Sequence, residues 1–261
     1  MRFVEPKVFA IGETVSIPEG ILALLAELGV PGWHTDAPTH AEGLIETYGR
    51  LCYRSFAPGL NPNVSRVREG NKEYLSNIIQ HKHGSVFEHT TVNFVFLGVS
   101  RVFTHELVRH RVGTAISQES LRFVRLTDLD FYIPEEVRSN PRALEIFEEA
   151  IQAGEKWQKE LAVVFGLDDK GTNFEVKKRL TSAMRRIAPE GLATIIGWTG
   201  NFRTLRYVIE TRTDPAAEPE IRFVFGEVAK FLIKRYPNAF GDFTFEIVDG
   251  LPYYTTLTGP I

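Results

Sequence analysis

Apolar residues recur at helical spacing along most of the chain, and this pattern predicts helices. The longest case follows Pro141, where Leu144, Phe147 and Ile151 begin an apolar stripe that continues to Phe165. Helices are predicted at residues 21–28, 40–52, 71–79, 101–110, 141–165, 174–187, 201–212 and 219–236.

Continuous apolar runs, which are typical of buried strands, are fewer. They predict strands at residues 7–12, 90–99 and 192–198, and the tail 250–261 is predicted to be extended. Residues 57–70 are rich in turn formers and predict a loop. Because helices dominate and the strands are dispersed, the pattern favours a mixed α+β domain over a doubly wound fold.

Two helix starts carry signals of their own. Thr39 and Glu42 have the spacing of a capping box, so Thr39 is predicted to cap the helix that follows it. Asn71 is predicted to cap the next helix. Cys52 falls among the apolar positions of the first of these helices, where an inert buried thiol is expected.

Composition sets the limits on class and partners. The chain of 261 residues is long enough to bury a core without staples, and its single cysteine excludes an internal disulfide. A formal charge of −3 argues against binding to a nucleic acid polymer, which favours strongly basic domains. The sequence has no apolar run of membrane-spanning length and no signal-peptide pattern, so a cytoplasmic protein without membrane contact is expected.

The charge pattern singles out residues 101–125. This segment has five arginines, no lysine and only two acids, Glu106 and Glu119, which give a local formal charge of +3. Arginine without lysine suits a bidentate task, because the guanidinium fork matches phosphate or carboxylate oxygens and stacks on flat rings. The alternative is a solvated basic surface.

Short nucleotide-binding motifs are missing from the sequence, so a nucleotide or flavin would have to be held by side chains such as arginines. His81, His83 and His89 are of the type that binds zinc or iron, although His81 and His83 would lie on opposite faces if the joint that holds them is extended. Two alternatives stay open: a metal-dependent nucleotide hydrolase that uses these histidines, and a non-catalytic nucleotide-binding module.

Two further segments carry polar candidates. Ser120 is either a nucleophile beside His110 or, as the neighbouring Arg122 favours, a hydroxyl that binds phosphate. Asn201 and Arg212 fall on one otherwise apolar face of a predicted helix. Polar groups there need a partner, either a salt bridge or a ligand with apolar rings and polar edges.

A long motif ties these candidates together. It consists of Arg109-His110-Arg111, eight residues, Ser120 and then Leu121-Arg122-Phe123, with a block from His83 to His89 upstream, and with Arg185 and residues 198–212 downstream. In this order the blocks resemble the flavin-dependent thymidylate synthases, over roughly residues 40–236.

The resemblance implies reductive methylation of deoxyuridine monophosphate (dUMP) to thymidine monophosphate (dTMP). Methylenetetrahydrofolate would give the carbon, reduced FAD the hydride, and NADPH would re-reduce the flavin. It also implies a homotetramer with shared active sites and an α+β fold with a small, largely antiparallel sheet flanked by helices. Residues 1–261 would then form a single domain, with 1–38 and 241–261 as extensions outside the match.

The matched positions imply roles for individual residues. Those implied for FAD are His83, Ser85, Glu88, Arg109, His110, Arg111, Gln118, Asn201, Arg203 and Tyr207. Those implied for dUMP are Glu106, Arg109, Gln118, Glu119, Ser120, Leu121, Arg122, Arg185 and Arg212. Arg212 is implied as the catalytic cation that polarises uracil. The sequence agrees with this role, because without a catalytic thiol the charge that develops on the pyrimidine needs a cation beside its oxygens.

Three positions depart from the family's pattern. The spacer before Ser120 is one residue longer than the common form, which leaves the roles of Gln118 and Glu119 interchangeable. Glu106 stands where many members have glutamine, and it would need a donor or a proton beside a nucleotide. Tyr207 stands where many have asparagine, and it would stack on the flavin or the adenine.

Overall fold

The computed structural model describes residues 2–122 and 130–261, which divide into two compact units. Unit 1 comprises residues 1–9, 95–110 and 116–198, and unit 2 comprises residues 10–94, 111–115 and 199–261. The helices are α1 (Pro18–Glu27), α2 (His40–Tyr53), α3 (Asn71–Gln80), α4 (Arg101–Leu107), α5 (Glu135–Arg138), α6 (Pro141–Val164), α7 (Phe174–Met184), α8 (Phe202–Thr213), α9 (Pro219–Arg235) and α10 (Pro237–Phe240), with 3-10 helices at Gly84–His89 and Arg185–Ile187. The strands are β1 (Arg2–Phe3), β2 (Lys7–Glu13), β3 (Thr91–Ser100), β4 (Thr114–Gln118), β5 (Asp130–Phe131), β6 (Ala193–Asn201), β7 (Thr244–Val248) and β8 (Leu251–Thr255).

The main sheet has four antiparallel strands in the order β2-β3-β6-β4. The Thr14 N–H donates to the Thr91 carbonyl at 3.1 Å beside β2, and the Glu119 N–H donates to the Ile195 carbonyl at 2.9 Å beside β4. The predicted α+β fold with a small, largely antiparallel sheet is confirmed. The single domain with two extensions stays a prediction. Each of the four strands contributes residues to both units.

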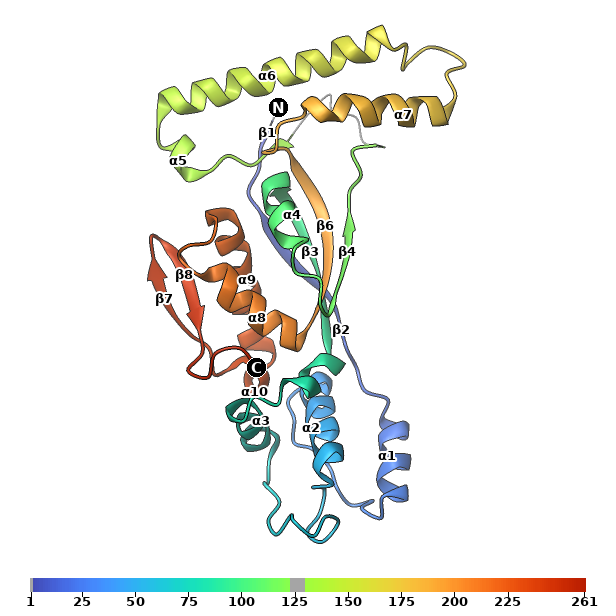
Figure 1. Cartoon of the computed structure of the whole chain (residues 1–261), viewed down its shortest axis with the longest axis vertical. Helices are drawn as coiled ribbons and strands as arrows, with labels where there is room; N and C mark the ends of the chain where they lie inside the picture. The colour runs from blue at the N-terminus through green and yellow to red at the C-terminus, as the bar shows by residue number, and fades with distance from the viewer. Residues whose placement is uncertain (1, 123–129) are drawn as a thin grey trace. The chain divides into compact units, whose positions relative to one another are not determined.

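Unit 2 is organised around α8 and α9, which pack on each other and on strand β8 (Figure 1). Their facing side chains recur at helical spacing and are completely buried, as the apolar pattern predicted. Each such side chain contributes about 1.5–3 kcal/mol by leaving water. Strand β8 pairs with β7, so residues 251–255 of the tail that was predicted to be extended form one arm of a hairpin, whereas residues 256–261 lie outside any strand.

The α2–α3 pair in unit 2 has a polar interior. Thr39 caps α2 by accepting from the Glu42 N–H, which confirms the capping box. The Asn71 cap is wrong: Gly70 precedes α3, and the buried Asn71 amide instead donates to the Glu46 carboxylate at 2.9 Å. The bond spans 25 positions, so local spacing gave no sign of it.

Cys52 is also placed differently from the prediction. It lies on α2 but is exposed, because the last turn of that helix presents this side chain to solvent. In the same unit, α1 begins three residues earlier than predicted, with Pro18 in its first turn where a missing N–H costs nothing.

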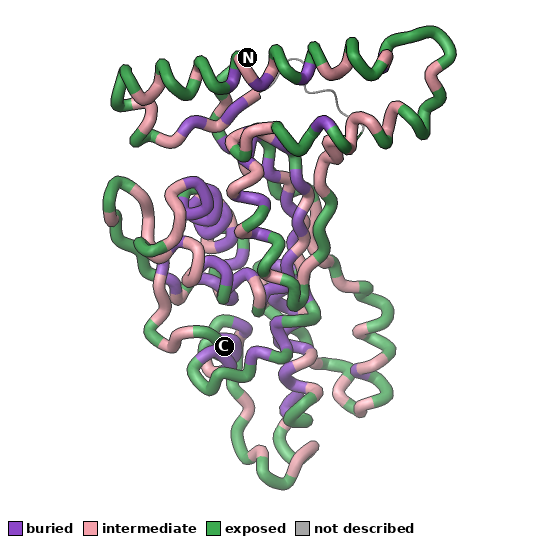
Figure 2. The backbone as a smooth tube through the Cα atoms, turned by 45° about the horizontal axis from the view of Figure 1, so that its top comes forward, coloured by how far each residue is buried: buried purple, intermediate pink, exposed green. Residues whose placement is uncertain are grey.

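Unit 1 carries two long amphipathic helices, α6 and α7. Helix α6 begins at Pro141 and is followed by Gly166 at φ +57°, as the sequence predicted, and Asn140 caps its start, which was not predicted. Ile151 packs in a small core with Phe131, but most of α6 is exposed or half-buried (Figure 2). Trp157, which belongs to the predicted apolar stripe, is 52% exposed.

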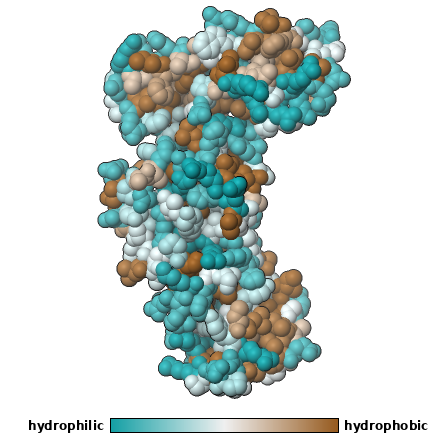
Figure 3. All heavy atoms as spheres, in the orientation of Figure 1, coloured by the Kyte–Doolittle hydropathy of each residue, from teal (hydrophilic) through white to brown (hydrophobic). Residues whose placement is uncertain are grey.

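Uncovered apolar surface occurs in both units. In unit 1 the exposed apolar side chains include Phe147 and Trp157 of α6, and in unit 2 they include Ile17 and Leu22 beside and on α1. Figure 3 shows hydrophobic residues gathered in patches on the surface. Contiguous apolar surface of this kind marks interaction sites more often than idle surface. None of the described helices has the length and hydropathy that a membrane crossing requires.

Candidate active site

A pocket of about 310 Å³ in unit 2 brings together four residues of the predicted flavin set. Glu88 comes from the 3-10 helix before β3, Asn201 ends β6, and Arg203 and Tyr207 stand on the first two turns of α8. The volume is at the lower end for small-molecule sites. The full lining is Glu88, Val112, Asn201, Arg203, Thr204, Tyr207, Pro260 and Ile261.

Arg203 is held by bonds on two sides of this pocket. Its Nη1 donates to Oε1 of Glu88 at 2.6 Å, and its Nε donates to the carbonyl oxygen of Ile261 at 2.9 Å. The ion pair is nearly half exposed, so it contributes only about 0–1 kcal/mol to stability. Its main effect is to fix the plane of the guanidinium group, which suits stacking on or bonding to a flat ring.

The turn after the Arg-His-Arg triplet is fastened to the start of α8. The Asn201 N–H donates to the Gly113 carbonyl at 2.9 Å, and the Thr204 hydroxyl donates to the Val112 carbonyl at 2.7 Å. Gly113 has φ +66°, and a Cβ there would lie 2.2 Å from Nδ2 of Asn201. Only glycine tolerates both conditions, so residues 111–115 depend on this contact for their position.

The upstream histidines lie together, contrary to the prediction of opposite faces. The rings of His81 and His83 have centroids 6.0 Å apart. The joint between α3 and the 3-10 helix is a tight turn, with Lys82 at φ +56°, and the opposite-face argument holds only for an extended joint. His83 is hydrogen-bonded to the Tyr53 hydroxyl at 2.5 Å, and Ser85 is exposed.

His89 does not join these two histidines in a metal site. Its ring stacks on Tyr48 with centroids 3.7 Å apart. Across residues 2–122 and 130–261, no three His, Cys, Asp or Glu side chains gather as metal ligands would. The hydrolase hypothesis, which needs His81, His83 and His89 together, is therefore not favoured.

In unit 1, the arginine segment begins with Arg101, which is half-buried at the start of α4. Its Nη2 donates to the Glu119 carbonyl oxygen at 3.2 Å, and its buried Nε has no partner among the described residues. Burial lowers the pKa of Arg101, the Glu119 carboxylate opposes that shift, and the charge of Arg185 adds to it. Because a guanidinium keeps its proton even so, Arg101 retains an unused donor at its buried Nε.

Gln118 and Glu119, whose roles the sequence left interchangeable, have different partners. The Gln118 amide donates to the Thr104 hydroxyl of α4 at 3.2 Å. The Glu119 carboxylate accepts from the Thr194 hydroxyl of β6 at 3.4 Å. The strand β4 that ends at Gln118 was not predicted, because its residues lack an apolar alternation.

Residues Ser120 to Arg122 form a turn after β4. The Ser120 hydroxyl accepts from the Arg122 N–H at 3.3 Å, which is the geometry of a short polar turn. Leu121 packs against the small core of unit 1, so it anchors the turn. Arg122 is exposed, and Phe123 and Arg125 of the same segment lie outside the described residues.

The Arg-His-Arg triplet follows α4 and is divided between the units. The N–H groups of Arg109 and His110 donate to the carbonyls of Glu106 and Leu107, which closes the helix with a turn. Arg109 and His110 belong to unit 1, whereas Arg111 belongs to unit 2. Both arginine side chains are exposed.

The remaining predicted residues follow the same division. Unit 2 holds His83, Ser85, Glu88, Arg111, Asn201, Arg203, Tyr207 and Arg212. Unit 1 holds Glu106, Arg109, His110, Gln118, Glu119, Ser120, Leu121, Arg122 and Arg185. Among the residues predicted for dUMP alone, Arg212, half-buried near the end of α8, is the exception that lies in unit 2.

Three residues were missed by reasoning from the sequence. Gly113 and Thr204 position the turn beside the pocket that Glu88 and Arg203 line, and Arg101 presents the unused donor in unit 1. An isolated glycine in a charged segment was a usable signal for Gly113. Arg101 was counted in the basic segment, but its burial is a tertiary property.

Comparisons with known proteins agree with the motif. A family model described as "Thymidylate synthase complementing protein" matches residues 35–238. A "Flavin-dependent thymidylate synthase" of Mycolicibacterium gilvum is 36% identical over 213 residues, which cover 81% of this chain and 82% of the relative. A protein of the same name from Corynebacterium glutamicum is 35% identical over 221 residues, which cover 84% and 86%.

A solved structure has the same fold. The UMP/dUMP methylase PolB from Streptomyces cacaoi, bound with 5-Br dUMP, superposes with a TM-score of 0.61 over 92% of this chain and 96% of its own. At 15% sequence identity the likeness concerns the fold alone.

Proposed function

The chain belongs to the flavin-dependent thymidylate synthases, and on that premise we propose that it methylates dUMP to dTMP with FAD as its flavin. Methylenetetrahydrofolate is the proposed carbon donor and NADPH the proposed reductant of the flavin. The family match over residues 35–238 carries the proposal, because it contains every predicted site residue from His83 to Arg212.

The pocket of Glu88 and Arg203 supports the flavin part of the proposal. A fixed guanidinium plane, the phenol ring of Tyr207 and the amide of Asn201 are the groups that hold a flat ring with polar edges. The pocket takes a ring-sized part of a flavin, so other surfaces must hold the rest. When bound, the flavin would supply the hydride, and the protein would supply position and charge.

The nucleotide part of the proposal rests on unit 1. Ser120, Arg122 and Arg185 would bind the phosphate of dUMP through charge-assisted hydrogen bonds, each worth roughly 1.5–3 kcal/mol. The unused Nε of Arg101 adds a donor in the same unit. Glu119 would orient Arg101, because its carbonyl oxygen accepts from the Arg101 guanidinium and its carboxylate is held by Thr194.

Arg212 would act on the uracil ring. Placed beside the pyrimidine oxygens, its guanidinium would favour the ionised N3 and stabilise the negative charge that makes C5 nucleophilic. A thiolate at C6 is the other chemical route to the same end. Cys52, the one cysteine of the chain, is exposed on α2 and is absent from the lining of the pocket that holds Glu88 and Arg203.

A homotetramer with shared active sites completes the proposal. The uncovered apolar residues of α6 and α1 support it, because burial of such surface drives association. Sharing would also supply the surfaces that a 310 Å³ pocket lacks for a whole flavin dinucleotide.

The test is direct. Purified protein should be yellow from bound flavin, and it should form dTMP from dUMP when methylenetetrahydrofolate and NADPH are supplied. A colourless protein with stoichiometric zinc would indicate the hydrolase instead. A colourless, metal-free protein that binds dUMP would indicate a binding module.

A further inference from the structure

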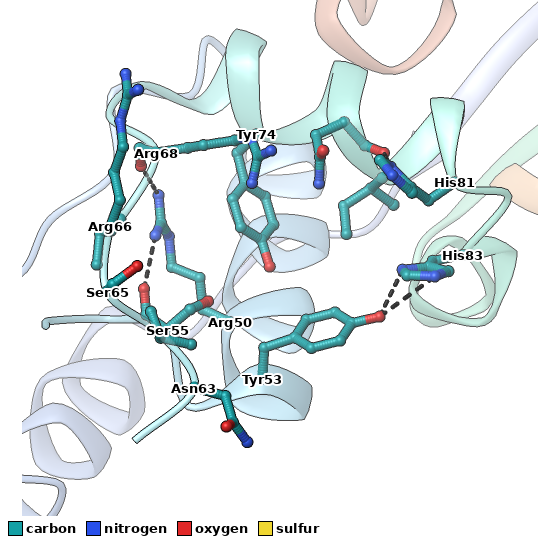
Figure 4. A pocket seen from close by; sticks show the side chains of 14 residues that line it. Arg50, Tyr53, Ser55, Asn63, Ser65, Arg66, Arg68, Tyr74, His81 and His83 are labelled. Carbon is teal, nitrogen blue, oxygen red and sulfur yellow. Dashed lines mark hydrogen bonds between the residues drawn. The ribbon is translucent and has the colours of Figure 1, made fainter. Parts of the chain in front are cut away.

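A second pocket of unit 2, about 350 Å³ in volume, is lined by α2, α3 and the loop between them (Figure 4). Four basic side chains line it: Arg66 and Arg68 from the loop, and His81 and His83 from the turn after α3. No acid stands among the described residues that line it. The arginines Arg66 and Arg68 are exposed, and neither has an ionic partner within the described residues.

A fifth basic residue, Arg50, builds the wall of this pocket. It is buried and pairs with the Glu46 carboxylate at 2.7 Å, so its charge is already balanced. Its Nη1 and Nη2 donate to the carbonyls of Ser55 and Arg68, at 2.9 and 2.8 Å. Arg50 therefore holds both ends of the loop and fixes the backbone position of Arg68.

Two buried hydroxyls in this pocket have no partner of normal hydrogen-bond geometry among the described residues. Tyr74 is 5% exposed and Ser55 is 9% exposed, and neither hydroxyl has a partner of hydrogen-bond geometry among the described residues, although the two lie near each other. Leaving such a group unpaired costs about 1–3 kcal/mol, so an unpaired buried hydroxyl suggests a functional role such as ligand binding. The Tyr74 hydroxyl points into the space bounded by Arg50, Tyr53 and His83 (Figure 4).

The Tyr74 hydroxyl is suited to donate. Burial raises its pKa to about 12, so it keeps its proton at any physiological pH. The Arg50 guanidinium lies 4.4 Å from the centroid of the Tyr74 ring, which holds that ring in place. The pocket thus offers a fixed neutral donor beside two unbalanced cations.

We propose that this pocket binds the anionic end of a co-substrate, a phosphate or carboxylate group, through Arg66, Arg68 and the hydroxyls of Tyr74 and Ser55. An oxyanion satisfies the two unpaired hydroxyls and the two unpaired charges at once, whereas a neutral or cationic group would satisfy only some of them. The identity of the co-substrate that carries the anion rests on the proposed function. The binding of an oxyanion to this pocket does not rest on it.

Two sources fit this chemistry. The glutamate chain of a folate presents several carboxylates, and the ribose phosphate of NADPH presents a dianion. Both would extend from a ring that reacts elsewhere, and His83, which lines the pocket and bonds to Tyr53, stands at the predicted junction with the flavin.

The binding test uses flavin-loaded protein with saturating dUMP, so that the predicted phosphate site of unit 1 is filled. Calorimetry measures the Kd of inorganic pyrophosphate. The double variant Arg66→Gln/Arg68→Gln should weaken binding roughly 10- to 100-fold. The control Lys72→Gln/Lys234→Gln removes the same charge from exposed positions outside the lining and should leave the Kd within about twofold.

Tyr74→Phe separates binding from folding. It should weaken pyrophosphate binding while leaving the melting temperature of the protein without pyrophosphate unchanged or higher, because the hydroxyl has no partner of normal hydrogen-bond geometry among the described residues. A fall in melting temperature with unchanged Kd would mean that the hydroxyl serves the fold, and this would overturn its role.

The source is separated by turnover. If folate supplies the anion, wild type should have a lower KM for triglutamylated than for monoglutamylated methylenetetrahydrofolate, and the double variant should lose this difference. Its ratio of the KM for NADPH to the KM for NADH should stay as in wild type. If the reductant supplies it, the reverse holds. Absence of dTMP with every substrate would contradict the proposed function but leave the pyrophosphate result intact. A Kd that is equal in the double variant and the lysine control, or no binding to wild type, overturns the pocket assignment.

Discussion

The candidate residues of the two units are held in different ways. In unit 2, Arg203 is bonded to Glu88, and Asn201 and Thr204 are fastened to the turn at Gly113. In unit 1, Arg101 keeps an unpaired buried donor near the charge of Arg185. Large flat cofactors need a shaped surface prepared in advance, whereas a small anion needs charges and donors that it can satisfy itself.

A change in the proposed flavin pocket of unit 2 disturbs bonds that exist without a ligand, so it should alter flavin content and folding together. A change at Arg122 or Arg185 of unit 1 removes a cation that is proposed to bind the phosphate, so it should alter the KM for dUMP more than the flavin content.

Arg212 gives the largest expected effect, because it lies in unit 2 but is predicted to act on the nucleotide. Arg212→Ala should lower kcat for dTMP formation by about 10²–10³-fold or more, since it removes the cation from the developing charge. Most of the flavin should stay bound, measured by absorbance after gel filtration. Arg212→Lys, which keeps a charge, should retain more activity than alanine, and wild-type turnover in the alanine variant would remove Arg212 from the mechanism.

Gly113→Ala tests how far the flavin pocket depends on its turn. The positive φ and the contact with Asn201 should together cost on the order of 1–3 kcal/mol. We expect a lower melting temperature and a lower flavin content. Gly32→Ala is the matched control, since a Cβ there meets nothing within 4 Å. Equal behaviour of the two variants would show that the turn does not position the pocket.

A crossed pair of variants tests the division itself. Arg122→Gln/Arg185→Gln should raise the KM for dUMP roughly 10- to 100-fold and leave flavin content unchanged. Arg203→Gln should weaken flavin binding and leave the KM for dUMP of the flavin-saturated protein near wild type. Loss of flavin in the first variant, or a large change in the dUMP KM in the second, would break the comparison.

The buried charges of unit 2 should show in the pH dependence of stability. Burial raises the pKa of the Glu42 carboxyl, and hydrogen bonds from Thr39, Asn238 and Ala239 oppose the shift only in part. The folded state then binds the proton more tightly than the unfolded state, so this carboxyl's contribution to stability falls as pH rises from its unfolded pKa through the raised one.

Denaturation at several pH values checks this sign. The free energy of unfolding of Glu42→Gln, relative to wild type, should increase as pH rises through that range. Glu73→Gln, on the exposed side of α3, should show no such trend. A trend of the opposite sign for Glu42→Gln would mean that its hydrogen bonds outweigh burial.

Cys52→Ala gives the smallest expected effect. The side chain is exposed and outside the predicted site, so activity and stability should change by no more than about twofold and about 0.5 kcal/mol. An inactive variant with normal flavin content would show that a thiol takes part in the reaction.

The prediction of Asn71 as a helix cap and the placement of His81 and His83 on opposite faces failed for one reason. Both assumed that neighbouring residues decide where a side chain goes. Asn71 instead bonds to Glu46, and the Lys82 turn brings the histidines together. Strand β4 was missed because its own residues lack an apolar alternation. Its pairing with β6 in the sheet defines it as a strand.

The sequence by itself determined the helices, the mixed fold and the family, because apolar spacing, caps and the Arg-His-Arg motif are local properties. Tertiary structure decided which of the basic residues are already balanced and which keep unused capacity. Arg50 and Arg203 have acidic partners, whereas Arg66 and Arg68 have none among the described residues. Burial and ion pairing depend on residues far apart in the chain, and charge composition alone does not reveal them.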